Sequence, residues 1–117
     1  MDELKERIDV IATQEIDLKI QRDLIREIDE EICILLAERR DISLNIGVYK
    51  AQENLPLEDL KQEDLQNKEL QKMAVRYHLN PDMLLKIWDN IRLETKSKHL
   101  AIKEYLDEIP KDKLKPQ

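Results

Sequence analysis

The fold of this chain is decided by residues 2–52, which read DELKERIDVIATQEIDLKIQRDLIREIDEEICILLAERRDISLNIGVYKAQ. This stretch contains no proline and a single glycine, Gly47. Alternating steps of four and three residues give a mostly aliphatic row: Leu4, Ile8, Ile11, Glu15, Leu18, Arg22, Ile25, Asp29, Ile32, Leu36, Arg39, Ser43, Ile46 and Lys50. Such a row is the buried seam of a long amphipathic helix.

The length of this predicted helix limits how its apolar seam can be covered. About fifty residues in a helix extend about 75 Å, whereas a globule of this chain length is roughly 35–40 Å across. The helix therefore either breaks, with residues 13–15 as the weakest part of the seam, or is covered by a second copy of the chain. We favour the second copy and predict a homodimer with one very long N-terminal helix in each protomer.

The same seam carries positive charge. Arg22, Arg39 and Lys50 lie on it, with one acid, Asp29, to pair with them. Buried cations are costly unless anions meet them, so the surplus indicates an internal site for an anionic ligand. The alternative is that the long Arg and Lys stems pack in the seam while their charged ends reach solvent.

Composition narrows the class of protein. The 117 residues suffice for one domain, and 39% charged residues, 41% hydrophobic residues and one glycine are typical of a helical bundle. We assign residues 1–106 to this domain and 107–117 to a mobile C-terminal tail. A net charge of −6 argues against binding nucleic acid. No cysteine and histidine cluster predicts a metal site, and without a signal sequence or membrane span we expect a cytoplasmic protein.

Two shorter helices are predicted after the long one. The first spans about 57–77 and follows Pro56, and the second spans about 81–106 with Asn80 as its N-cap. Polar residues interrupt the inward row of each helix: Asp59 and Glu63 in the first, Thr95 and His99 in the second. Three helices with polar interruptions on inward faces predict an all-α protein whose pockets lie between helices.

Several of these residues recur at the spacing of a known family. The chain resembles the all-helical class of chorismate mutases, without a gap, over roughly residues 18–100. The positions that carry the resemblance are Arg22, Ile28-Asp29, the run LLAERR at 35–40, Tyr49-Lys50, Pro56, Asp59 and Glu63. The LLAERR run alone is a weak signal, whereas the charged residues at matching spacing are much more specific.

The resemblance implies an intertwined homodimer of three-helix protomers with two equivalent active sites. It also implies the rearrangement of chorismate to prephenate, an isomerase reaction of aromatic amino acid biosynthesis in the shikimate pathway that needs no metal or cofactor. Its site would take a small dicarboxylate. Carried over by position, Arg39 and the partner subunit's Arg22 would bind the two carboxylates of the substrate. Lys50 would contact the ether oxygen and a carboxylate. Asp59 and Glu63 would contact the ring hydroxyl, and Thr95 would lie near a carboxylate.

Two positions depart from the family pattern. Gln62 stands where the family commonly has an arginine, which removes a cation from the pocket. His99 stands where the family has a glutamine or an acid that donates to the ether oxygen. An imidazole can also donate a hydrogen bond, so we predict that His99 is the ether-oxygen donor. The alternative is a partly exposed histidine near the end of its helix.

Two other functions stay open at this stage. One is an isochorismate pyruvate lyase of the same fold, which the changed positions 62 and 99 leave possible. The other is a helical dimer without catalytic activity that serves as an interaction or regulatory module. In that case the charged seam would set the register of the paired helices, as polar residues do in coiled coils.

Overall fold

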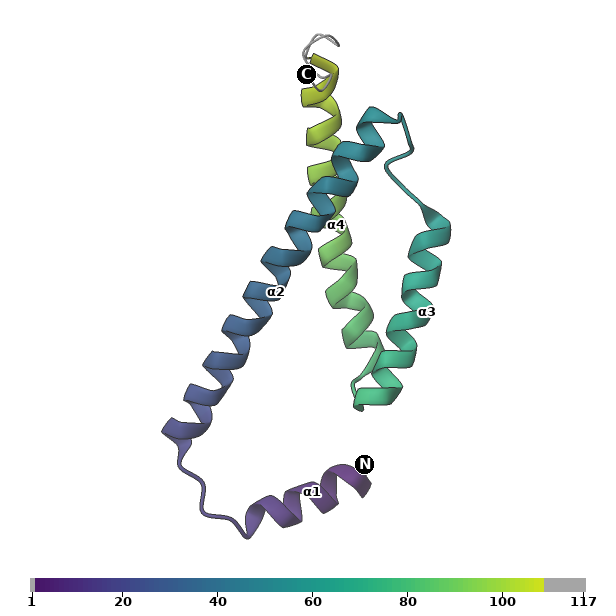
Figure 1. The fold of residues 1–117 in the computed structure, drawn as a ribbon. Helices are drawn as coiled ribbons and strands as arrows, with labels where there is room; N and C mark the ends of the chain where they lie inside the picture. Colours follow the sequence, from purple (N-terminus) through teal and green to yellow (C-terminus); the bar gives the residue numbers. More distant parts are fainter. Residues whose placement is uncertain (1, 109–117) are drawn as a thin grey trace. The chain divides into compact units, whose positions relative to one another are not determined.

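The computed structural model describes residues 2–108, and these residues form four helices and no strand. The helices are α1 (Asp2–Ala12), α2 (Leu18–Gln52), α3 (Leu60–Tyr77) and α4 (Pro81–Glu108) (Figure 1). The chain divides into two compact units, Met1–Ala37 and Glu38–Gln117, and α2 runs through the boundary. The predicted all-α class is confirmed. The predicted tail, 107–117, lies almost wholly outside the described residues.

The prediction of three helices with an unbroken first one was wrong, because the chain leaves the helix between Ala12 and Leu18. The hydroxyl of Thr13 donates to the carbonyl of Val10 at 2.7 Å. The carboxylate of Asp17 accepts from the backbone N–H groups of Lys19 at 2.9 Å and Ile20 at 3.2 Å, as an N-cap does. Local side-chain bonds of this kind compete with helix propagation, so they end α1 and start α2 although the apolar seam continues.

The boundaries of α3 and α4 follow from their capping residues. Asp59 has an extended backbone, and its carboxylate accepts from Gln62 N at 3.1 Å, which caps α3. His78 ends α3 in the left-handed conformation, with φ of 55°. Asn80 then accepts from Met83 N at 3.1 Å to cap α4. The predicted start of α4 after its N-cap Asn80 is confirmed, whereas α3 begins at Leu60, three residues later than the predicted start at about residue 57. Both starts follow a short polar side chain that satisfies a free N–H group of the first turn.

A small apolar core joins α3 to α4. Leu70 and Ala74 of α3 and Leu84 of α4 are buried, and Leu85 and Trp88 pack against them. Figure 1 shows the two helices side by side as a hairpin. The core lies toward the turn between them, so the other end of the hairpin is left open for polar residues.

The C-terminal part of α2 reaches α4 at Gly47. A Cβ atom at this position would stand 2.6 Å from His99 Cδ2 and 2.9 Å from Ile102 Cδ1. Real side chains do not approach so closely, so only glycine permits this contact. Gly47 is also the one buried residue of α2. The side chains of His99 and Ile102 therefore pack directly against the α2 backbone at Gly47.

Most of the apolar seam of α2 is uncovered by the described residues. Ile32 is 49% exposed and Ile46 48%, and Ile25, Ile28, Leu35 and Ile42 are exposed as well. Side chains of this type are usually buried in folded proteins.

None of the helices within residues 2–108 combines the length and the apolar character needed to cross a membrane.

Candidate active site

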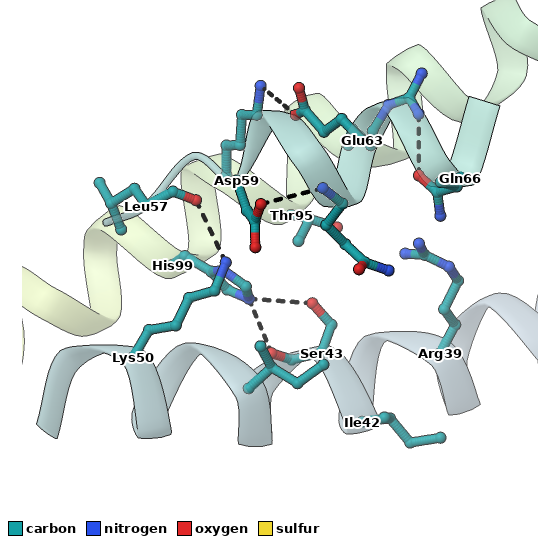
Figure 2. Close-up of a pocket in the computed structure, with 14 residues that line it drawn as sticks. Arg39, Ile42, Ser43, Lys50, Leu57, Asp59, Glu63, Gln66, Thr95 and His99 are labelled. Carbon is teal, nitrogen blue, oxygen red and sulfur yellow. Dashed lines mark hydrogen bonds and ion pairs between the residues drawn. The ribbon is translucent and has the colours of Figure 1, made fainter. Parts of the chain in front are cut away.

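A pocket of about 510 Å³ lies among the helices of the unit Glu38–Gln117 (Figure 2). The C-terminal part of α2 forms one wall, and α3, α4 and the loop before α3 form the others. The volume falls within the range of small-molecule sites. Its lining residues are Arg39, Ile42, Ser43, Ile46, Lys50, Leu57, Asp59, Gln62, Glu63, Gln66, Arg92, Thr95, Lys96 and His99.

The structure brings together every predicted site residue except one. The pocket includes Arg39, Lys50, Asp59, Gln62, Glu63, Thr95 and His99. Arg22 belongs to the unit Met1–Ala37 and does not line the pocket of its own chain. Four further polar residues of the lining were not predicted as site residues: Ser43, Gln66, Arg92 and Lys96.

The α2 wall presents two cations without acidic partners. Arg39 is half-buried and has no hydrogen bond or ion pair with any described residue. Figure 2 shows its side chain rising from α2 toward α3 and α4. Lys50 lies three turns further along α2, and its ammonium donates to the backbone carbonyl of Leu57 at 3.4 Å. A carbonyl does not neutralise an ammonium ion, so both charges remain available to an anionic ligand.

On the α3 side, two acids and an amide face these cations. The carboxylate of Asp59 caps α3 through Gln62 N, so its position is set by the start of the helix. Glu63 follows in the first turn, where the helix dipole favours an acid. Gln62 and Asp59 are exposed at the rim, whereas Glu63 is half-buried.

Lys96 of α4 holds Glu63 in place. Its ammonium lies 2.8 Å from Glu63 Oε1 and 3.2 Å from Glu58 Oε1. The hydrogen bond to Glu63, and secondly the one to Glu58, raises the pKa of Lys96 above its ordinary value of 10.5. The ion pair links α4 to α3 and fixes one oxygen of Glu63, which leaves the other oxygen for a ligand.

Arg92 closes the far end of the pocket. Its side chain is only 13% exposed and lies 2.6 Å from the carboxylate of Asp89. It also donates to Gln66 Oε1 at 2.9 Å and to Asn67 Oδ1 at 2.8 Å. Because three acceptors from two helices hold the guanidinium, Arg92 fixes the spacing of α3 and α4.

Ser43 of α2 and His99 of α4 meet at the base of the pocket. His99 is 4% exposed, and its Nε2 lies 2.8 Å from the backbone carbonyl of Ser43 and 3.1 Å from the hydroxyl. Thr95, one turn earlier on α4, donates its hydroxyl to Ile91 O at 2.9 Å. Its oxygen can still accept a hydrogen bond, but its hydrogen is already used.

The charges of the lining favour an anion. Four cationic side chains (Arg39, Lys50, Arg92 and Lys96) and two acidic ones (Asp59 and Glu63) line the pocket of a chain of net charge −6. Arg92 pairs with Asp89 and Lys96 with Glu63 and Glu58, so Arg39 and Lys50 supply two positive charges without an acidic partner among the described residues. The arrangement therefore suits a small dianion. Among residues 2–108 no group of three or more His, Cys, Asp or Glu side chains is placed to hold a metal ion.

The residues that sequence reasoning missed lie on or beside the predicted rows. Ser43 is on the seam of α2 itself, but a serine there carries no charge to single it out. Arg92 and Lys96 each follow directly after an inward residue of α4, Ile91 and Thr95. Positions i and i+4 share a helix face, so the spacing of Arg92 and Lys96 is the signal that could have identified them.

The family model for chorismate mutase type II matches residues 21–99. The matched segment includes Arg22 and every residue that lines the pocket. None of the curated proteins compared with the chain matches it.

Proposed function

Because this chain belongs to the chorismate mutase type II family, we propose that it converts chorismate to prephenate at the pocket in the unit Glu38–Gln117. The observation that carries the proposal is the α2 wall, where Arg39 and Lys50 face the pocket with two positive charges that lack an acidic partner among the described residues. Chorismate bears two carboxylates. A dianion of this size supplies the counter-charges that these two side chains lack among the described residues.

The proposed roles on the α2 wall follow from charge and geometry. Arg39 would bind one carboxylate, since a guanidinium can donate two parallel hydrogen bonds to it. Lys50 would leave the carbonyl of Leu57, a long contact of 3.4 Å, and donate to the ether oxygen and a carboxylate. As the C–O bond breaks, negative charge grows on that oxygen, and an ammonium held beside it stabilises the transition state more than the ground state.

The opposite wall would bind the ring hydroxyl. Asp59 and Glu63 accept hydrogen bonds, and the ion pair with Lys96 at 2.8 Å holds the carboxylate of Glu63 in place. The Thr95 hydroxyl would turn from the carbonyl of Ile91 to donate to a carboxylate. Gln62 at the rim would donate its amide in place of a charged group. His99 lies at the base of the pocket and was predicted to donate a hydrogen bond to the ether oxygen.

The proposed reaction requires the protein only to hold the substrate in its reactive conformer and to stabilise the charge that develops. The rearrangement is unimolecular, because a C–O bond breaks and a C–C bond forms within one molecule. Confining the substrate in its compact conformer removes conformational freedom before the reaction. Placed donors then stabilise the charge that develops.

We also propose that two copies of the chain pair through α2, and that the partner subunit's Arg22 completes each site. The support is the exposure of Ile32, Ile46 and their neighbours along the α2 seam. An exposed apolar surface of this extent marks an association site. Arg22 lies on the same seam as Arg39, but it does not line the pocket of its own chain. An intertwined arrangement, a cytoplasmic location and a role in the shikimate pathway stay predictions.

A direct assay tests the proposed function. Purified protein is mixed with chorismate, the loss of its absorbance is followed, and the product is identified by chromatography and mass. We expect prephenate, at a rate proportional to protein concentration. The same protein is offered isochorismate: release of salicylate and pyruvate, with no prephenate from chorismate, would replace the mutase by a lyase of the same fold. No conversion of either substrate would overturn the proposal and favour a non-catalytic dimer.

A further inference from the structure

Ser43 and His99 form a pair that the proposed roles leave unexplained. They lie 56 positions apart in the sequence, yet Nε2 of His99 contacts both oxygens of Ser43, at 2.8 Å for the carbonyl and 3.1 Å for the hydroxyl. Figure 2 shows the two side chains facing one another at the base of the pocket. The contact joins α2 to α4 directly below the space where a ligand would lie.

The carbonyl decides which atom carries the hydrogen. A backbone carbonyl only accepts, so the 2.8 Å contact requires a hydrogen on His99 Nε2, in the neutral Nε2–H tautomer or in the cation. The same N–H lies 3.1 Å from the Ser43 hydroxyl oxygen, which therefore accepts from it. His99 thus donates its Nε2–H to Ser43, so this hydrogen does not point at a ligand.

Ser43 is then left with a hydrogen to donate. Its hydroxyl hydrogen has no acceptor among the described residues, and the side chain is half-buried in the pocket wall. Arg39 lies four residues before Ser43 and Lys50 seven residues after it, so all three share one face of α2. A donor in this place meets the middle of a ligand whose ends Arg39 and Lys50 hold.

We propose that Ser43 is a catalytic residue that donates its hydroxyl hydrogen to the ether oxygen of the substrate, and that His99 is a positioning residue that acts through Ser43. The inference rests on the proposed function and replaces the prediction that His99 itself donates to that oxygen. When the C–O bond breaks, the departing oxygen gains negative charge and the serine donor shares it with Lys50. No proton is transferred, since the rearrangement conserves every hydrogen.

The packing explains why His99 can hold Ser43 in one orientation. The imidazole is 4% exposed, and Gly47, one turn after Ser43, gives it room because a Cβ there would lie 2.6 Å from Cδ2. A ring so confined cannot turn its Nε2–H away from Ser43. A serine hydroxyl that already accepts from the ring has fewer orientations left for its own hydrogen, so the donor is preorganised.

The test is a double-mutant cycle on steady-state kinetics with the full chain. We expect Ser43→Ala to lower kcat on the order of 10²-fold, as loss of a transition-state donor does, with little change in KM or thermal stability, since alanine favours a helix. His99→Leu should lower kcat by a similar factor, and the double variant Ser43→Ala/His99→Leu should lose little more. His99→Gln should recover activity, because its amide can donate to Ser43. The matched control is Ser97→Ala, an exposed serine of α4.

Each outcome decides between the inference and its rivals. A Ser43→Ala variant with wild-type kcat overturns the inference while the proposed function stands. The same holds if His99→Leu loses far more than Ser43→Ala and the two losses multiply, since His99 would then act on the substrate by itself. A wild-type protein that leaves chorismate unchanged overturns the proposed function, and the inference with it.

Discussion

Gly47 of α2 lies against His99 of α4 so closely that a Cβ at position 47 would stand 2.6 Å from the imidazole Cδ2. The imidazole of His99 thus occupies the space that a side chain at position 47 would fill. This contact brings α2 and α4 together beside the pocket, and the hydrogen bonds between His99 and Ser43 lie one turn away. The packing contact and the proposed chemistry therefore both depend on His99.

Gly47→Ala tests this dependence. Alanine favours a helix over glycine by about 1 kcal/mol, but the clash with a buried ring costs about 1–3 kcal/mol, so we expect a net loss of stability. Denaturant unfolding at one fixed protein concentration measures it. Asn45→Ala, at an exposed position of the same helix, should be neutral or stabilising. A Gly47→Ala protein that is more stable than wild type and fully active would contradict the close contact.

Arg39→Ala should abolish ligand binding while the neighbouring Arg40→Ala leaves it intact. Arg39 lines the pocket without a partner among the described residues, whereas Arg40 is exposed and pairs with Asp41 at 3.1 Å. We expect Arg39→Ala to reduce kcat/KM on the order of 10²–10³-fold, because a substrate carboxylate would lose its guanidinium partner. Calorimetric binding and kinetics measure this. If Arg39→Ala changes the oligomeric state and not ligand binding, the arginine sets helix register instead.

Lys96→Met should weaken catalysis through Glu63, whose carboxylate the ammonium contacts at 2.8 Å. We expect kcat/KM to fall roughly tenfold, the lower end of the loss when a partner that orients a site residue is removed, and Lys96→Arg to recover most of it. Lys98→Met is the matched control, because Lys98 is exposed and only reaches Glu94 at 3.7 Å. Equal losses in both lysine variants would point to a general charge effect.

The stability that Lys96 contributes should disappear at alkaline pH. Hydrogen bonds to Glu63 and Glu58 raise the pKa of Lys96 in the folded protein above the ordinary value of 10.5. A raised pKa in the folded state stabilises the protein fully below the unfolded value and loses this effect as pH rises through the folded value. The difference in unfolding free energy between wild type and Lys96→Met should thus be constant below 10.5 and shrink above it. A difference that grows with pH would contradict the ion pair.

Ile32→Asp should prevent the proposed pairing of two chains. Ile32 is 49% exposed on the α2 seam, and a carboxylate there would have to lose its water in a dimer interface. Sedimentation should show wild type as a dimer and Ile32→Asp as a monomer, with activity lost in the monomer because the partner subunit's Arg22 is absent. Glu30→Ala, off the seam on the same helix, should stay dimeric. A wild-type monomer with full activity would refute both the pairing and the shared site.

Much of the site could be read from helical spacing because its residues recur on helix faces. Arg39 and Lys50 stand on the α2 seam, and Asp59 and Glu63 lie at the start of α3, so local periodicity placed each pair on an inward face of its own helix. The helix break at residues 13–17 was not settled by the row, which weakens at Glu15 and resumes at Leu18, because it depends on the bonds of Thr13 and Asp17 to the local backbone. The row reports which side chains share a face, and the break depends on hydrogen bonds that the row does not encode.

By itself the sequence determined the all-helical class, the N-cap of α4 at Asn80 and a surplus of cations along one face, because each depends on residues within a turn or two of one another. The tertiary structure alone decided that His99 Nε2 faces Ser43 and that Lys96 holds Glu63. These pairs lie on different helices, so their meeting depends on where α2, α3 and α4 approach. That approach is set in part by a glycine at position 47 and by the small core of α3 and α4, and no local pattern records it.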